Sequence, residues 1–266
     1  MLPAAIVWDV DPIIFHIGAR GVRWYGLLFA LAIYLGYRFF ERVFREEKLP
    51  PQLLDRLALY VIIGIIVGAR LGHVLFYDWP YYSRHPIDII KIWEGGLASH
   101  GGAFGILLAF WLFVRKYRSQ YPQLSYLWLL DRMVIPTALG GALIRLGNLF
   151  NSEILGRPAD LPWAFIFKRI DNLPRHPAQL YEAVTYFLVF LLLRWLYRRR
   201  QWGRYRGRLL GLFLTLVFGM RFVIEFFKER QESFQHPLPV DMGQLLSIPF
   251  VLVGLYLWFR PTARRA

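Results

Sequence analysis

Residues 97–105 read Leu97-Ala98-Ser99-His100-Gly101-Gly102-Ala103-Phe104-Gly105 and open an apolar run that extends to residue 114. A membrane-spanning helix needs about 20 predominantly apolar residues. Seven runs of the chain approach this length, at residues 23–43, 54–77, 97–114, 124–145, 178–197, 208–228 and 242–260. The sequence therefore predicts an all-α polytopic membrane protein with seven transmembrane helices, forming one integral membrane domain over residues 1–266.

The composition of the whole chain agrees with this prediction. Of the 266 residues, 56% are hydrophobic and 18% are aromatic, which is more than a soluble domain usually contains. Lys and Arg outnumber Asp and Glu by 32 to 18, but the basic residues gather in short connections between the apolar runs. Such placement favours membrane lipid, and not nucleic acid, as the anionic partner.

The positions of the basic connections predict the orientation in the membrane. They lie at residues 38–48, 115–118, 194–208 and 260–265, which all fall on one side of a seven-helix chain. Because Lys and Arg are retained in the cytoplasm, we expect an outer amino terminus and a cytoplasmic carboxyl terminus. The first 17 residues lack the basic-then-apolar order of a cleavable signal peptide, so we expect them to be retained.

Two stretches between the apolar runs predict elements outside the bilayer core. Residues 79–94 are aromatic and amphipathic, which indicates interfacial helices on the outer side. Residues 146–177, between the fourth and fifth transmembrane helices, contain four prolines that break helices, Pro158, Pro162, Pro174 and Pro177. We therefore expect a small extracytoplasmic lobe of turns over residues 146–177.

His100 is the first candidate functional residue, because an ionisable group at membrane depth usually serves a cavity or a reaction. A histidine pKa near 6.5 suits proton transfer at neutral pH. Gly101, Gly102 and Gly105 follow it and form a small-residue face that lets another backbone or a lipid approach closely. The alternative is a hydrogen-bonded structural histidine beside a helix-packing glycine face, and the spacing alone does not separate the two interpretations.

Two arginines on other apolar runs complete the candidate site. Arg145 and Asn148 stand three residues apart, on one helical face, and a planar guanidinium matches a phosphate group. Arg221 and Glu225 stand four residues apart, so Arg221 faces the same cavity with Glu225 orienting it, or the two form an inert buried ion pair. For Arg145 the alternative is a charge that reaches back to the membrane surface beside a helix-capping Asn148.

Metal and cofactor chemistry has little support in the sequence. The six histidines show no paired metal-ligand spacing, and no Walker, Rossmann or nucleophile-elbow pattern occurs. The absence of cysteine excludes disulfides and thiolate ligands, so any thiol chemistry must use the sulfur of a substrate. We expect no metal and no cofactor.

Five blocks of sequence together resemble the bacterial prolipoprotein diacylglyceryl transferases. They are spread over nearly the whole chain, and their order and separation are more specific than any block alone. The blocks are Ser99-His100-Gly101-Gly102, the run from Arg145 to Arg157, His176-Pro177-Ala178-Gln179-Leu180-Tyr181-Glu182, Arg221-Phe222-Val223-Ile224-Glu225-Phe226-Phe227 and Met242-Gly243-Gln244-Leu245-Leu246-Ser247-Ile248-Pro249.

The resemblance implies an enzyme of the bacterial inner membrane that moves the diacylglyceryl group of phosphatidylglycerol to the lipobox cysteine in the signal peptide of a preprolipoprotein. A thioether and glycerol 1-phosphate would result. On matching positions it implies catalytic residues His100, Tyr25, Arg221 and Glu225, and substrate-binding residues Arg145, Asn148, Glu153 and Gly156. The chain departs from the family pattern where Val217 and Phe218 replace a tyrosine, and where Lys228 replaces an arginine.

The chemistry implied by the resemblance makes two demands on such a site. A thiolate attacks a glycerol carbon while a phosphate ester leaves, so the thiol must lose its proton and positive charge must stabilise the leaving group. We expect His100, supported by Tyr25, to take the proton and the two arginines to hold the phosphate. The alternative function is a transporter or channel for an anionic solute, and an intramembrane protease lacks a convincing arrangement of residues.

Overall fold

The computed structural model describes residues 5–18, 20–229 and 241–261. The seven predicted apolar helices are confirmed as helices, with bounds within a few residues of the prediction except at the end of the fourth. They are α1 (Trp24–Glu46), α2 (Pro51–Phe76), α4 (Ser99–Tyr117), α5 (Tyr126–Asn151), α6 (Ala178–Arg199), α7 (Arg208–Glu225) and α8 (Met242–Phe259). Residues 230–240 and 262–266, which include part of the predicted outer connections and carboxyl-terminal charges, lie outside the described residues.

Four of the described helices are long and apolar enough to cross a membrane, namely α2, α5, α6 and α8. In α7, by contrast, 18 residues include Arg208, Arg221 and Glu225. The chain is therefore mostly helical with four candidate spans, and the predicted number of seven spans stays a prediction.

Two small β-sheets correct the all-α prediction. The strand β1 (Ile6–Trp8) pairs in parallel with β4 (Phe165–Phe167), which pairs antiparallel with β5 (Pro174–Arg175). A separate hairpin joins β2 (Ile13–Ile17) to β3 (Arg20–Arg23). The prolines do create turns, but aromatic and β-branched residues between them favour a strand, whose partner comes from more than 150 residues away in the chain, too far for a local pattern to reveal.

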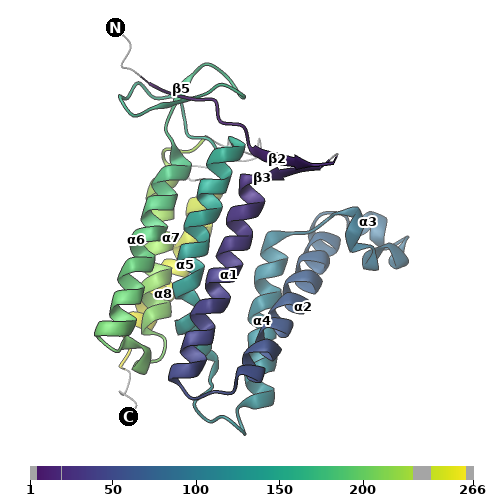
Figure 1. Cartoon of the computed structure of the whole chain (residues 1–266), viewed down its shortest axis with the longest axis vertical. Coiled ribbons are helices and arrows are strands. Elements are labelled where there is room, and N and C mark those ends of the chain that lie inside the picture. The colour runs from purple at the N-terminus through teal and green to yellow at the C-terminus, as the bar shows by residue number, and fades with distance from the viewer. Residues whose placement is uncertain (1–4, 19, 230–240, 262–266) are drawn as a thin grey trace. The chain divides into compact units, whose positions relative to one another are not determined.

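The lobe starts later than predicted, because α5 continues to Asn151 and ends where Ser152 adopts a left-handed conformation with φ of 55°. Leu149, Phe165 and Phe167 form its buried core. The partly buried side chains of Trp8, Leu155 and Leu180 pack against that core. The sheet is thereby fixed to the ends of α5 and α6 (Figure 1).

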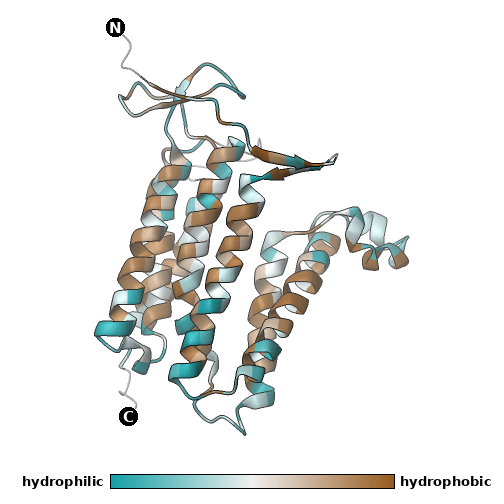
Figure 2. Ribbon diagram, in the orientation of Figure 1, coloured by the Kyte–Doolittle hydropathy of each residue, from teal (hydrophilic) through white to brown (hydrophobic). Residues whose placement is uncertain are grey.

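The chain divides into two compact units, and the single domain over residues 1–266 stays a prediction. Unit 1 comprises residues 1–36 and 130–266, and unit 2 comprises residues 37–129. In unit 1, α5, α6, α7 and α8 lie together with the β1-β4-β5 sheet at one end of the bundle (Figure 1). Hydrophobic residues cover the middle of these helices, and hydrophilic residues collect toward their other end (Figure 2).

Unit 2 is built on a close contact between α2 and α4. A Cβ atom on Gly64 would lie 2.6 Å from the carbonyl oxygen of Gly105, and one on Gly72 would lie 2.7 Å from Cα of Gly101. Only residues without a side chain allow such an approach of two helix backbones. The predicted small-residue face of α4 is therefore confirmed, and its partner is α2.

The predicted interfacial segment of unit 2 is helical but broken into short turns, α3 (Trp79–Tyr82), η1 (Pro86–Ile90) and η2 (Ile92–Glu94). The buried Arg70 guanidinium holds the segment by donating to the carbonyls of Ile89 at 2.8 Å and Gly95 at 2.6 Å. Ile87 and Trp93 are about three-quarters exposed, as side chains immersed in lipid would be. The location of the segment at the membrane surface stays a prediction.

Replacement of Gly105 by alanine should destabilise unit 2. The new Cβ would meet the backbone of Gly64, and overpacking of this kind costs about 1–3 kcal/mol. Gly102 on the same helix is the matched control, because a Cβ there meets Ala69 only at 3.6 Å. We expect G105A to lower the midpoint of thermal unfolding in detergent and G102A to leave it equal or higher. Equal midpoints for the two variants would contradict the packing argument.

Candidate functional site

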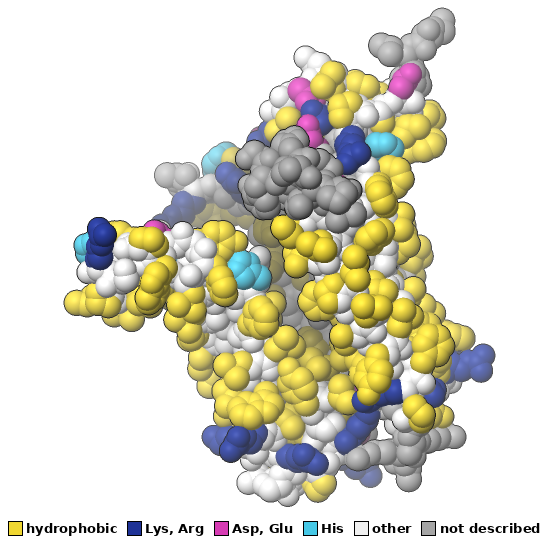
Figure 3. Space-filling view, turned by 180° about the vertical axis from the view of Figure 1, so that it is seen from behind, with side chains coloured by type: hydrophobic (Ala, Val, Ile, Leu, Met, Phe, Trp, Pro, Cys, Tyr) yellow, Lys and Arg dark blue, Asp and Glu magenta, His cyan; other side chains and the backbone are white. Residues whose placement is uncertain are grey.

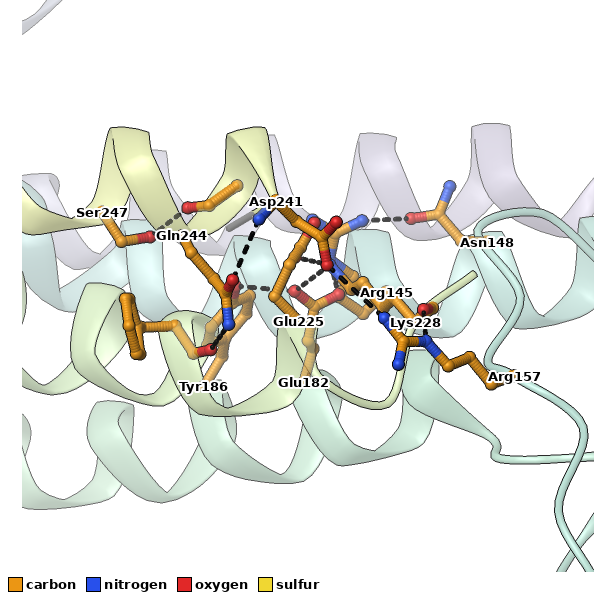
Figure 4. A network of polar contacts seen from close by, with 12 residues as sticks. Arg145, Asn148, Arg157, Glu182, Tyr186, Glu225, Lys228, Asp241, Gln244 and Ser247 are labelled. Atoms are coloured by element: carbon orange, nitrogen blue, oxygen red, sulfur yellow. Dashed lines mark hydrogen bonds and ion pairs between the residues drawn. The ribbon is translucent and has the colours of Figure 1, made fainter. Parts of the chain in front are cut away.

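A buried carboxylate, Glu182, lies at the centre of a polar network in unit 1 (Figure 4). Glu182 follows Pro177 by one turn and a half at the start of α6, and none of its surface is exposed. Its Oε2 atom lies 2.8 Å from Nε of Arg145 on α5, and its Oε1 atom accepts a hydrogen bond of 2.9 Å from Nζ of Lys228. The contact with Arg145 is an ion pair without hydrogen-bond alignment, since Oε2 has no hydrogen-bond partner in the part of the chain described.

Lys228 brings a second carboxylate into the network. Its Nζ atom also lies 3.1 Å from Oε2 of Glu225, three residues earlier in the chain. The predicted pairing of Arg221 with Glu225 is therefore wrong. The chain turns at Phe226 directly after α7, which brings the lysine back over Glu225. Within the described residues, Arg221 makes no hydrogen bond and no ion pair.

Arg145 and Asn148 do share one face of α5, as predicted. A guanidinium NH group of Arg145 donates to Oδ1 of Asn148 at 3.1 Å, and Nδ2 of Asn148 donates to Oε2 of Glu153 at 3.0 Å. Asn151 donates to the other oxygen of Glu153 at 3.1 Å. Three of the predicted substrate-binding residues thus form one continuous chain of contacts at the end of α5.

Buried polar atoms without a partner surround Glu153. The fully buried Gln179 donates through Nε2 to the Glu153 carbonyl at 2.6 Å, but its Oε1 atom has no partner among the described residues. The same holds for Oδ1 of Asn151 and Oγ of Ser152. Native proteins satisfy nearly all buried polar atoms, so this cluster offers hydrogen-bonding capacity to a ligand or to water.

The Tyr186 hydroxyl joins the same network, since it donates a long hydrogen bond of 3.4 Å to Glu182. That Arg145 and Arg221 face one cavity stays a prediction. Neither Val217, which is buried, nor Phe218, which stacks on Phe250 with ring centroids 4.3 Å apart, supplies a hydroxyl group here.

Tyr25 and Gly156 occupy positions where backbones pass closely. The Tyr25 side chain lies against Gly147, where a Cβ would stand 2.7 Å from Cδ2 of the ring, so it is one residue from Asn148. Gly156 pairs with Lys228 in an isolated β-bridge and lies against the backbone of His176. Gly156 therefore has a packing role, and its contact with substrate stays a prediction.

Two arginines of the lobe hold the chain on either side of residues 230–240. Arg157 donates to the Lys228 carbonyl at 2.9 Å and lies 3.6 Å from Oδ2 of Asp241. The buried Arg175 pairs with Asp171 and lies 2.9 Å from Glu229. The Arg175 guanidinium holds the pKa of the Asp171 carboxyl below its usual range. The lobe thereby fixes the backbone that carries Lys228.

His100 belongs to unit 2 and is exposed at the first turn of α4. Its described contacts are with aromatic rings of the same unit. Its ring centroid lies 5.9 Å from that of Phe76 and 5.6 Å from that of Tyr77. Its predicted role in proton transfer stays a prediction.

The sequence marks Glu182, with Gln179, as a candidate lining of the outer mouth and Lys228 as a departure from the family pattern, but it predicts neither as a site residue. A carboxylate at the start of an apolar helix, three residues after Gln179, indicates a functional site as the arginines do. Ionisable residues at membrane depth usually have a function. The capping box of α8, where Asp241 and Gln244 exchange backbone and side-chain bonds, matches the Asp-x-x-Gln pattern. No cluster of His, Asp and Glu placed to hold a metal ion occurs among the described residues.

The sequence was also compared with known proteins. The family model described as prolipoprotein diacylglyceryl transferase matches residues 12–260. A relative named phosphatidylglycerol–prolipoprotein diacylglyceryl transferase from Tolumonas auensis is 52% identical over 98% of this chain and 99% of its own length. Relatives of the same name from Chloroherpeton thalassium and Porphyromonas gingivalis are 51% and 48% identical, over 96% and 97% of this chain and 94% and 95% of their own lengths.

Replacement of Glu182 by glutamine should destabilise unit 1 strongly. The change leaves two cations without their shared carboxylate, and breaking a buried ion pair on one side costs about 3–5 kcal/mol. Glu229, which is half exposed in its pair with Arg175, is the control, since exposed pairs contribute about 1 kcal/mol or less. We expect E182Q to lower the thermal midpoint far more than E229Q, and the double variant E182Q/K228M to recover part of the loss. Similar midpoints for E182Q and E229Q would contradict this account.

The lobe should lose stability as the pH falls from 7 to 5. Burial lowers the pKa of His176, whose ring packs against those of Tyr181 and Phe227. In that pH range the unfolded chain, with a histidine pKa of about 6.5, takes up a proton that the folded lobe resists, so stability present above pH 6.5 is lost below it. Asp171, with its lowered pKa, contributes only at more acidic pH.

Limited proteolysis of the lobe at pH 7 and pH 5 measures this effect. We expect cleavage of the native chain to accelerate at pH 5 and H176Q to show a smaller ratio of the two rates. His85, which is exposed in unit 2, is the control position. An unchanged ratio in H176Q would assign the pH dependence to another group.

Proposed function

This chain belongs to the prolipoprotein diacylglyceryl transferase family, and we propose that it moves the diacylglyceryl group of phosphatidylglycerol to the lipobox cysteine of a preprolipoprotein. The carbon–oxygen bond to the phosphate breaks, a carbon–sulfur bond forms, and glycerol 1-phosphate leaves. The observation that carries this proposal is the polar network at the end of α5, where Arg145, Asn148 and Glu153 are joined by hydrogen bonds. Arg221, on α7, makes no hydrogen bond or ion pair within the described residues.

The charges of the network explain why the two arginines are suited to a phosphate. Glu182 is shared between Arg145 and Lys228, and Lys228 also neutralises Glu225. Arg221 therefore retains its positive charge without a carboxylate among the described residues. A cation in a water-poor site stabilises the negative charge that develops on a departing phosphate.

The polar cluster at the end of α5 suits the glycerol head group of phosphatidylglycerol. Asn148 donates a hydrogen bond to Glu153, and the oxygens of Gln179, Asn151 and Ser152 without a partner in the described part of the chain can accept hydrogen bonds from hydroxyl groups. We assign the head group to these residues. Gly156 supports them through the backbone of the lobe.

The thiol proton requires a separate acceptor. His100 is the proposed base on its chemistry and on the family resemblance, with Tyr25 as its proposed support. Glu225 contacts Lys228 and not Arg221, so we assign it a positioning role through Lys228. The sulfur comes from the protein substrate, since the chain itself contains no cysteine.

The proposed chemistry goes with a proposed topology. Seven transmembrane helices would place the amino terminus, the interfacial segment and the lobe outside the bacterial cytoplasmic membrane, with the carboxyl terminus in the cytoplasm. The site residues at the lobe end of α5 and α6 would then lie at the level of the outer leaflet. A preprolipoprotein signal peptide in the membrane presents its cysteine at the same side.

Transfer can be tested directly with the purified chain in vesicles. We expect a lipobox peptide to gain the mass of a diacylglyceryl group in vesicles that contain phosphatidylglycerol, and no gain in vesicles of phosphatidylethanolamine alone. The measurement is mass spectrometry of the peptide. Anion flux across the vesicle membrane without peptide modification would instead support a transporter or channel.

The roles of the two arginines can be tested in the same assay. Removal of one contact to a developing charge costs about 10²–10³ in kcat, so we expect losses of this size for R145Q and R221Q. Because R145Q also disturbs Glu182, R221Q is the sharper test. Arg199, which is exposed at the end of α6, provides the control R199Q. Activity of R221Q within a few-fold of the native chain would refute the assignment.

A further inference from the structure

The end of unit 1 away from the lobe carries a second group of arginines that the proposed reaction does not use. The turn between α6 and α7 contains the short helix η3 (Trp202–Arg204). It lies against the end of α8, where the ring centroid of Trp202 is 6.3 Å from that of Trp258. Arg260, just after α8, donates to the Arg206 carbonyl at 2.8 Å. The turn and the end of α8 therefore form one surface.

Two arginines of this surface are held in fixed positions by aromatic rings and backbone. The Arg208 guanidinium lies 4.3 Å from the ring centroid of Tyr205 and 5.9 Å from that of Trp202. The Arg260 guanidinium lies beside Gly207, directly before Arg208 in the chain. The Nε atoms of Arg208 and Arg260 are both buried without a hydrogen-bond partner in the described part of the chain.

Many arginines surround the turn, and an acid that contacts it is buried. Asp131 has no exposure to solvent. Its two oxygens accept hydrogen bonds from the backbone N–H groups of Gly207 and Leu210. The arginines of the surface and its surroundings are Arg132, Arg198, Arg199, Arg200, Arg204, Arg206, Arg208 and Arg260.

Topology alone does not explain how Arg208 and Arg260 are held. Charges that set the orientation of a membrane protein need only be present in its cytoplasmic connections, and exposed residues such as Arg199 and Arg204 meet that need. Arg208 and Arg260 are instead partly shielded from water and restricted in their rotamers. This ordering costs free energy, which a bound ligand would compensate. Figure 3 shows dark blue side chains beside yellow hydrophobic ones at this end of the helices, as expected where a bilayer ends.

We propose that Arg208, Arg260 and Trp202 bind the phosphate head group of an anionic phospholipid in the leaflet at this end of unit 1. A guanidinium pair supplies forked donors to phosphate oxygens, and a tryptophan is favoured at head-group depth. Basic pockets between membrane helices bind anionic lipids in this way. The site is distinct from the one around Glu182 and goes beyond the proposed transfer reaction.

Native mass spectrometry of the full chain in detergent tests the proposal. The probe is phosphatidylserine, an anionic lipid other than the proposed substrate, with phosphatidylcholine as the neutral comparison. We expect R208Q/R260Q to weaken phosphatidylserine binding by about 10- to 30-fold, the equivalent of two interfacial charges. The matched control R199Q/R204Q removes the same charge from exposed positions and should weaken binding by no more than about 3-fold, because solvent screens it.

The outcomes distinguish lipid binding at this site from the proposed transfer reaction. Equal losses in the two double variants, or equal binding of the two lipids by the native chain, would overturn the proposal. R208K/R260K keeps the charge without the planar fork, so it serves where the glutamine variant fails to fold. A loss greater than that of R199Q/R204Q then supports the proposal, and a loss no greater overturns it. We expect peptide modification in detergent to persist in R208K/R260K, and a chain that lacks transfer activity would still bind phosphatidylserine here.

Discussion

Glu182 carries a negative charge at a position with no exposure to solvent, and the arrangement of unit 1 follows from its need for partners. An isolated carboxylate in such a place is unstable by several kcal/mol. Two cations from separate elements, Arg145 of α5 and Lys228 beyond α7, compensate for it. Three elements must therefore meet at one point, and the lobe assists because Gly156 bridges the backbone of Lys228.

This constraint also determines which charges remain available for chemistry. Lys228 is occupied by Glu182 and Glu225, and Arg145 is occupied in part by Glu182 and Asn148. Arg221 keeps its charge unpaired among the described residues. A site that holds its carboxylates with one set of cations and leaves another cation open is preorganised for an anion, because the positive potential exists before the ligand arrives.

The sequence predicted what depends on local composition and missed what depends on distant pairing. Long apolar runs indicated the helices, and the three-residue spacing of Arg145 and Asn148 correctly placed them on one face. The spacing of Arg221 and Glu225 suggested a pair equally well, but it could not register the competing Lys228, which reaches Glu225 only because the chain turns after α7. The pairing of β1 with β4 was missed for the same reason, because Ile6 and its partner Phe165 are far apart in the sequence.

The structural arginines of this protein differ from Arg221 in how many of their guanidinium N–H groups donate hydrogen bonds within the protein. Arg70 donates to four backbone carbonyls, and Arg175 engages two carboxylates and the Gly156 carbonyl. Such residues hold loops in place, and their donors have little left to offer. Arg221, which is half-buried, has no such contacts within the described residues, so its N–H groups stay available. Because a cation in an apolar helix usually faces a cavity or a binding partner, these open donors argue for an anionic ligand at Arg221.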